Sequence, residues 1–191
     1  RTISKNKQTR TENHITITDN GDWKAGFYND CNTSDNGYKN NTVYNNTITT
    51  SESMSGQRLR AYGILFDDSR IYSNDISIDL TNAYNGNSNS DSHGCGIHTD
   101  RSEVYDNEIT VNDPHTRAND VGIYAMGGNS NNRNQVYNNI ITVIHASKGI
   151  WANYADIYDN YLTTGEQVDH ENWAIGHGNY NHIYNNQIIG G

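Results

Sequence analysis

Three residues within four positions, His98, Asp100 and Arg101, carry side chains of the kinds that catalyse proton transfer. Histidine titrates near neutral pH and serves as a general base, and a positioned carboxylate acts as an acid or a base. A guanidinium neutralises negative charge that develops beside it. We therefore take this segment as the candidate catalytic group. The alternative is that all three are solvated loop residues, because polar loops occur throughout this sequence.

A wider set of ionisable residues lies between the apolar segments of the chain, comprising His93, His115, Arg117, Lys148, Asp169, His170 and Glu171. A fold that brings these segments to one side would gather them around the candidate catalytic group. No spacing among them matches the ligand pattern of a particular metal ion. We therefore expect no metal site and no cofactor, and Ca²⁺ binding by loop carboxylates stays open although no motif indicates it.

A sequence phrase that repeats along the chain predicts the strands that position these residues. Each of six copies has Val or Ile, then Tyr, a polar residue and Asn, with Ile or Leu two positions later; the copies begin at Val43, Ile71, Val104, Val136, Ile157 and Ile183. A degenerate first copy ends at residues 13–16. Alternation with a period of two predicts short strands whose Val and Ile side chains point inward.

A second phrase lies between these copies: Gly63-Ile64, Gly96-Ile97, Gly122-Ile123, Gly149-Ile150 and Ala174-Ile175, preceded by Gly26-Phe27. Repeats of this length, each containing two or three short strands, predict stacked coils. We expect an all-β chain forming a single-stranded, right-handed parallel β-helix of about seven coils, with long loops on one side. One domain spans residues 1–191, either as a segment of a longer chain or as a stacking subunit.

Equivalent residues of successive coils fall into columns. One column is an asparagine ladder at a bend between strands, where asparagine tolerates unusual backbone angles and bonds the turn backbone; it comprises Asn13, Asn46, Asn74, Asn107, Asn139, Asn160 and Asn186. An outward column of tyrosines comprises Tyr44, Tyr72, Tyr105, Tyr137, Tyr158 and Tyr184. We interpret the first as structural, and the second as either a protective stack or a binding strip.

The residue after each Gly-Ile pair should also point outward, which gives a candidate glycan-binding or interface column of Tyr28, Leu65, His98, Tyr124 and Trp151. Beside it we expect a bare shelf of glycines, Gly26, Gly63, Gly96, Gly122 and Gly149. Aromatic rings beside a bare shelf suit sugar rings or another chain.

The repeats resemble those of the parallel β-helix superfamily, which includes pectate-lyase-like proteins, polygalacturonases, phage tailspikes and repeat-rich surface proteins of bacteria and archaea. The resemblance covers roughly residues 10–189 and is closest in character to adhesin-like surface proteins. It implies the fold, whereas this fold carries many functions. Enzymes of the superfamily act mostly on acidic polysaccharides, through paired carboxylates or through a base with a charge-neutralising partner.

Four fragments resemble motifs of these enzymes. Asp67-Asp68 and Gly176-His177-Gly178 resemble two polygalacturonase elements, and His98-Thr99-Asp100 loosely resembles a third. In that family the third element precedes the Asp-Asp element, whereas here it follows Asp67-Asp68, and the Arg-Ile-Lys element is missing. Asp113-Pro114-His115 resembles the core of an alginate epimerase motif, without the tyrosine and glycine that precede it there. No complete enzyme motif is present.

Composition limits the partners. The formal net charge is -9 with no Lys/Arg cluster, which excludes nucleic acid, and no apolar run approaches the length of a membrane span. Only 33% of the residues are hydrophobic, yet 14 tyrosines and regularly spaced Ile and Val oppose disorder. Whether Cys31 and Cys95 form a disulfide stays open.

These observations favour a non-catalytic extracellular or cell-surface scaffold, either adhesin-like or a self-assembling appendage or envelope subunit. The sequence opens at Arg1 and stops at Gly190-Gly191, directly after a strand phrase, without a segment for a capping helix, so we expect end-to-end or lateral association with copies of itself. One alternative is a polysaccharide lyase or glycoside hydrolase that acts on an acidic glycan along the Gly-Ile face. Another is passive, tailspike-like glycan binding by that face.

Overall fold

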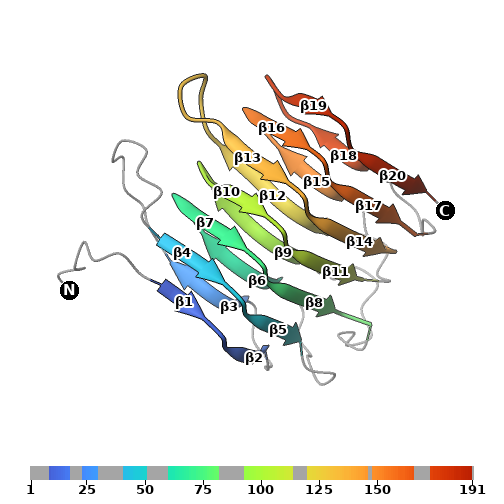
Figure 1. Ribbon diagram of the computed structural model, residues 1–191. Helices are drawn as coiled ribbons and strands as arrows, with labels where there is room; N and C mark the ends of the chain where they lie inside the picture. The colour runs from blue at the N-terminus through green and yellow to red at the C-terminus, as the bar shows by residue number, and fades with distance from the viewer. Residues whose placement is uncertain are drawn as a thin grey trace.

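The computed structural model describes residues 9–17, 23–29, 41–50, 60–81, 93–113, 120–145, 148–165 and 173–190. Every regular element in these ranges is a β-strand. The strands stack into three sheets that are parallel throughout, so the chain is the parallel β-helix that its repeats predict (Figure 1). Within the same ranges there is no helix that is long and apolar enough to cross a membrane.

Among the described residues, six coils contribute one strand to each sheet, and the C-terminal coil contributes strands to sheets A and B only. Sheet A holds the Val/Ile-Tyr strands β1 (Thr9–Thr11), β4 (Asn41–Tyr44), β7 (Ser69–Tyr72), β10 (Glu103–Tyr105), β13 (Asn134–Tyr137), β16 (Ala155–Tyr158) and β19 (His182–Tyr184). Sheet B holds β2 (His14–Ile17), β5 (Thr47–Thr50), β8 (Asp75–Asp79), β11 (Glu108–Asn112), β14 (Ile140–Ile144), β17 (Tyr161–Thr164) and β20 (Gln187–Gly190). Sheet C holds the Gly-Ile strands β3 (Trp23–Asn29), β6 (Arg60–Phe66), β9 (His93–Asp100), β12 (Val121–Gly127), β15 (Lys148–Ala152) and β18 (Trp173–His177).

The register between coils follows the repeats position by position. Val104 of β10 pairs with Ile71 on one side and with Val136 on the other, and Ile109 of β11 pairs in the same way with Ile76 and Ile141. Seven strands each in sheets A and B confirm the prediction of about seven coils. The connections from sheet B to sheet C, where long loops are predicted, fall largely outside the described residues.

The core is a narrow column of aliphatic side chains between the three sheets. Val104, Ile109 and Ile97 supply the three inward positions of one coil, and each is at most 1% exposed. Their equivalents in the neighbouring coils belong to the same cluster. A coil therefore needs only a few apolar residues to bury its share of the core, which explains how a chain that is one-third hydrophobic folds.

The asparagine ladder is confirmed, although the physical reason differs in one respect from the prediction. Nδ2 of Asn107 donates to Oδ1 of Asn139 at 3.0 Å and to the carbonyl of Tyr105 at 3.0 Å. Oδ1 of Asn107 accepts from the backbone N–H and from the Nδ2 of Asn74. The unusual backbone angle belongs to the preceding residue, such as Asp106 with φ 54°, and not to the ladder asparagine. The ladder position is therefore selected for its amide, which satisfies buried turn backbone.

The prediction of a bare glycine shelf is wrong. Gly96 and Gly122 are buried, and a Cβ on either would point at an isoleucine of sheet B. A Cβ on Gly96 would lie 2.4 Å from Cγ2 of Ile109 and 2.6 Å from the carbonyl oxygen of Gly122. Glycine is required here because any side chain would overlap the core and the next coil.

Candidate functional site

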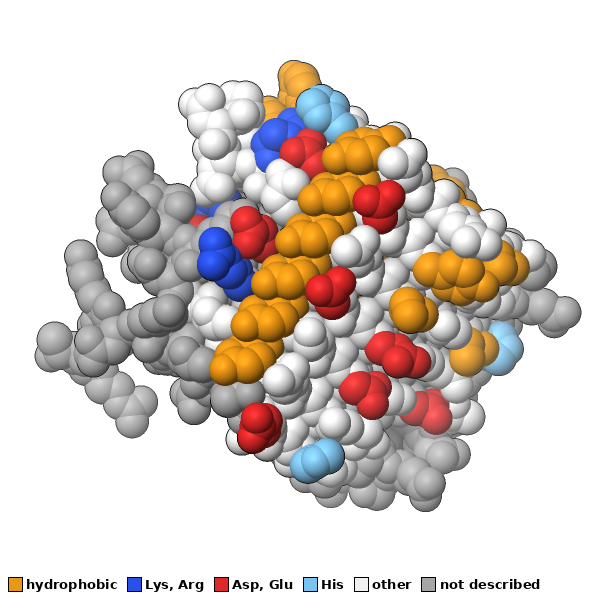
Figure 2. Space-filling view, in the orientation of Figure 1, with side chains coloured by type: hydrophobic (Ala, Val, Ile, Leu, Met, Phe, Trp, Pro, Cys, Tyr) orange, Lys and Arg blue, Asp and Glu red, His pale blue; other side chains and the backbone are white. Residues whose placement is uncertain are grey.

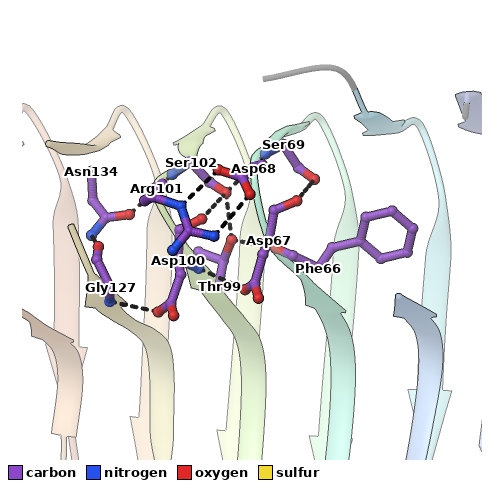
Figure 3. A network of polar contacts seen from close by, with 10 residues as sticks. All are labelled: Phe66, Asp67, Asp68, Ser69, Thr99, Asp100, Arg101, Ser102, Gly127 and Asn134. Carbon is purple, nitrogen blue, oxygen red and sulfur yellow. Dashed lines mark hydrogen bonds and ion pairs between the residues drawn. The ribbon is translucent and has the colours of Figure 1, made fainter. Parts of the chain in front are cut away.

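The turn from sheet C to sheet A places Asp68 and Arg101 side by side on adjacent coils (Figure 3). Both have left-handed backbone angles, with φ 49° and 52°. Nε and Nη2 of Arg101 each donate to one carboxylate oxygen of Asp68 at 2.8 Å, and these side chains are 25% and 11% exposed. A bidentate, partly desolvated pair is stronger than an open surface pair. The Arg101 charge is therefore already used to join two coils.

Asp67 and Asp100 occupy the neighbouring position of the same turn. Oδ1 of Asp67 accepts from the backbone N–H of Asp100 at 2.9 Å, and Oδ1 of Asp100 accepts from the backbone N–H of Gly127 on the next coil. Burial, reinforced by the charge of Asp100, raises the pKa of Asp67 to about 6. Arg101 opposes this shift. Asp67 thus exchanges a proton closer to neutral pH than an ordinary aspartate does.

A second polar ladder continues through this turn. The backbone N–H of Ser69 donates to Oγ of Ser102 at 3.0 Å, and that of Ser102 donates to Oδ1 of Asn134 at 3.0 Å. Two coils later the N–H of Ala155 donates to Oδ1 of Asn181 at 3.0 Å. This ladder is not evident from the sequence because serine and asparagine share its positions, and no single residue type repeats. Its presence means that the turn is held by bonds between coils on both sides of the Asp68–Arg101 pair.

His98 lies in the predicted outward column of sheet C. It is in register with Leu65 and Tyr124, Tyr124 is in register with Trp151, and Leu65 with Tyr28. The His98 and Tyr124 rings are 4.6 Å apart at 67°, and those of Tyr124 and Trp151 are 5.5 Å apart at 77°. Burial lowers the pKa of His98 although Asp100 opposes the shift, so the imidazole is neutral at pH 7.

A small apolar cluster of Tyr62, Cys95 and Val121 lies next to this column and contacts Leu65, Tyr124 and Trp151. Lys148 follows Val121 in the register, and its Nζ lies 4.1 Å from the Trp151 ring centroid. This contact places a cation over one ring face. Cys95 is a fully buried free thiol, and its possible partner Cys31 lies outside the described residues.

Most of the wider ionisable set lies beyond what the structure describes: His115, Arg117, Asp169, His170 and Glu171 are outside the described ranges, and only the backbone of His93 is described. Among the described residues no group of three or more His, Cys, Asp or Glu side chains could hold a metal ion. Ca²⁺ binding by loop carboxylates stays an open prediction.

The fragment Asp113-Pro114-His115 has one described residue, and it is not at the surface. Asp113 and Asp120, which bracket residues 114–119, are both fully buried. The Asp120 carboxyl accepts from the backbone N–H of Gly94. Burial, then the charge of Asp113 and a hydrogen bond with it, raise the pKa of Asp120 well above its usual range. Two buried carboxyls in contact hold a proton between them, and no motif or spacing in the sequence predicts this pair.

The tyrosine column forms a continuous stack along sheet A, seen as the long hydrophobic stripe in Figure 2. Rings on successive coils are 4.8 to 5.0 Å apart, with interplanar angles of 0° to 8°. Neighbouring rings therefore cover one another's faces within the stack, so a sugar ring cannot stack on an inner tyrosine. In the outward column of sheet C, by contrast, neighbouring aromatic rings are inclined to one another at 67° and 77°.

No protein-family model, curated protein or solved structure matches this chain. What the site can do therefore rests on its own geometry. Burial raises the pKa of Asp67 to about 6 and lowers the pKa of His98, whereas Arg101 is paired with Asp68 and Asp100 binds the backbone of the next coil. Of the three candidate catalytic residues, two are engaged in contacts between coils.

Proposed function

We propose that this chain is a non-catalytic structural β-helix that serves as an extracellular or cell-surface scaffold. The observation that carries the proposal is the bidentate Asp68–Arg101 pair between adjacent coils. A lyase acting on an acidic glycan needs a cation to offset the substrate's charge, and Arg101 gives its charge to Asp68. Arg101 and Asp100, two of the three candidate catalytic residues, thus make contacts that hold adjacent coils together.

The ladders support the same proposal. Five asparagines of the ladder, Asn46, Asn74, Asn107, Asn139 and Asn160, are at most 2% exposed and bond one another coil by coil. Such continuity makes a stiff rod whose outer faces vary freely, which suits presentation or assembly. We propose copies of the same chain as partners, through lateral or end-to-end association. Light scattering at rising concentration tests this part, and a chain that stays monomeric contradicts it.

A double-mutant cycle tests the fastening role. We expect Asp68→Ala and Arg101→Ala each to lower the urea midpoint, and the double variant to cost little more than either one. A coupling free energy of about 1 kcal/mol or more between the two substitutions supports the proposal that this pair holds the coils together; the threshold is set low because the pair is partly exposed. Arg70 and Glu103, whose ion pair at 3.0 Å is more open, give the matched control with a smaller coupling. Additive effects at Asp68 and Arg101 contradict the proposal.

A second candidate function is glycan recognition by the outward column of sheet C. The observation that favours it is the inclination of the rings, since Tyr124 and Trp151 meet at 77° and do not cover each other's faces. The expected ligand is an extended polysaccharide lying along the column. Trp151→Ala should abolish retention on a polysaccharide panel while the circular dichroism spectrum is unchanged, with Tyr158→Ala in the tyrosine stack as the control. Equal retention by all three proteins would remove this candidate.

A further inference from the structure

The tyrosine stack has a geometry that its predicted protective role does not require. Five successive ring pairs join Tyr44, Tyr72, Tyr105, Tyr137, Tyr158 and Tyr184, with centroid distances of 4.8 to 5.0 Å. Because the planes differ by at most 8°, equivalent ring carbons of neighbours are also about 5 Å apart. The first five rings, from Tyr44 to Tyr158, are half-buried and Tyr184 is 48% exposed, so a small oxidant reaches the phenols.

We propose that this stack is an oxidative modification site, at which tyrosines of adjacent coils join through their ortho carbons to give dityrosine. The co-reactant is a hydroperoxide acting through a one-electron oxidant. This inference stands apart from the scaffold proposal, because it depends only on the ring geometry. Its consequence is a covalent link between coils 28 to 33 residues apart in sequence at positions such as Tyr44–Tyr72 and Tyr72–Tyr105.

The reaction balances as follows. Each of two neighbouring phenols loses one electron and its hydroxyl proton, which gives two phenoxyl radicals. A bond forms between their ortho carbons, and the two ring hydrogens move to the oxygens, which restores both hydroxyl groups. The two electrons and two protons removed overall reduce one hydrogen peroxide to two waters. The rings must tilt toward each other to form the bond, and their open outer edges leave room for this.

The surroundings of the stack supply proton acceptors. Burial, followed by the nearby charge of Glu103, raises the pKa of Tyr137 to about 12, and Asp106 acts in the same direction. The phenol is therefore protonated at neutral pH and must release a proton when it is oxidised. That proton passes to solvent, toward the carboxylates of Glu103 and Asp106, whose charges act on this phenol.

The test treats the folded chain, at low concentration, with hydrogen peroxide and a haem peroxidase. Dityrosine is read by its fluorescence and located by mass spectrometry of peptides. We expect links between neighbours in the stack, within a chain that keeps the mobility of a monomer after denaturation. A variant with Tyr72→Phe, Tyr137→Phe and Tyr184→Phe keeps every ring but leaves the remaining phenols two coils apart, about 10 Å.

That alternating variant should lose all links within the stack and retain, among the described tyrosines, the Tyr154–Tyr180 pair, whose rings are 4.8 Å apart. A matched variant with Tyr28→Phe, Tyr62→Phe and Tyr124→Phe removes three phenols elsewhere and should keep the stack links. Wild-type chain in urea, which has no stack, should give scattered pairs. Links between non-adjacent tyrosines in the folded chain, links only between chains, or an undiminished yield in the alternating variant would each overturn the proposal.

Discussion

Replacing Asn107 by alanine removes one rung from the middle of the asparagine ladder. The side chain is 2% exposed and bonds groups on both neighbouring coils. Its Nδ2 donates to the carbonyl of Ile71 at 2.9 Å and to Oδ1 of Asn139 at 3.0 Å, and its Oδ1 accepts from the backbone N–H of Asn74 at 3.1 Å. Alanine makes none of these bonds.

The expected loss in the free energy of unfolding follows from the buried groups that lose a hydrogen-bond partner. Asn74 keeps its own side-chain bonds to the carbonyls of Val43 and Tyr72, but its buried backbone N–H loses the acceptor. The carbonyl of Ile71 loses the Asn107 donor. Each buried group left without a partner costs about 1–3 kcal/mol. We therefore expect a loss of about 4 kcal/mol, a large share of the 5–15 kcal/mol that stabilises a typical domain.

The assay is urea unfolding followed by circular dichroism, with Asn112→Ala as the matched control. Asn112 belongs to the same coil, but its Nδ2 bonds only the exposed side chains of Asp79 and Thr81. Its replacement should cost less than about 0.5 kcal/mol. A urea midpoint for Asn107→Ala that is no lower than that for Asn112→Ala would contradict the stabilising role of the buried ladder hydrogen bonds.

Three further outcomes follow from the structure. Gly96→Ala, whose Cβ would lie 2.4 Å from an isoleucine methyl, should cost about 3 kcal/mol in urea unfolding; Gly165→Ala, with its nearest contact at 3.4 Å, should change the midpoint little, and equal effects would contradict the packing argument. Folding raises the pKa of Asp67 from 3.8 to about 6, so its contribution to stability is fully present below pH 3.8 and is lost as pH rises through about 6. The melting temperature of Asp67→Asn should lack this decline, and an unchanged pH profile would refute the assignment. Burial raises the pKa of the Cys95 thiol far above its usual range, so peptide mapping should find it alkylated only after unfolding, and rapid alkylation of the folded chain would show the thiol to be accessible.

The repeats predict most of the fold because each coil uses the same residues for the same physical task. Val104, Tyr105, Asn107 and Ile109 recur at fixed spacing, and the structure assigns them the inner face of sheet A, its outer stack, the turn and the inner face of sheet B. A repeated residue type therefore carries the register directly.

The features that the repeats do not predict depend on distances between strands in space, and the spacing of residues along the sequence does not specify those distances. The glycine column was predicted to face outward from simple alternation, and the close approach of Gly96 to Ile109 shows that it faces the core. The pairing of Asp68 with Arg101 and the raised pKa of Asp67 arise from burial in a turn that changes composition from coil to coil. Mixed composition hides a column from a search for repeats.

The measurement that tests the scaffold account most directly is product release from a broad panel of polysaccharides, including acidic ones, by the purified chain. New reducing ends and unsaturated uronate are quantified for the wild-type chain and for Asp67→Asn and His98→Ala, which alter the two groups of this region whose pKa values are shifted mainly by burial. The account predicts no release above the buffer blank from any of the three proteins. Release by the wild-type chain that either variant abolishes would contradict it and make this turn an active site.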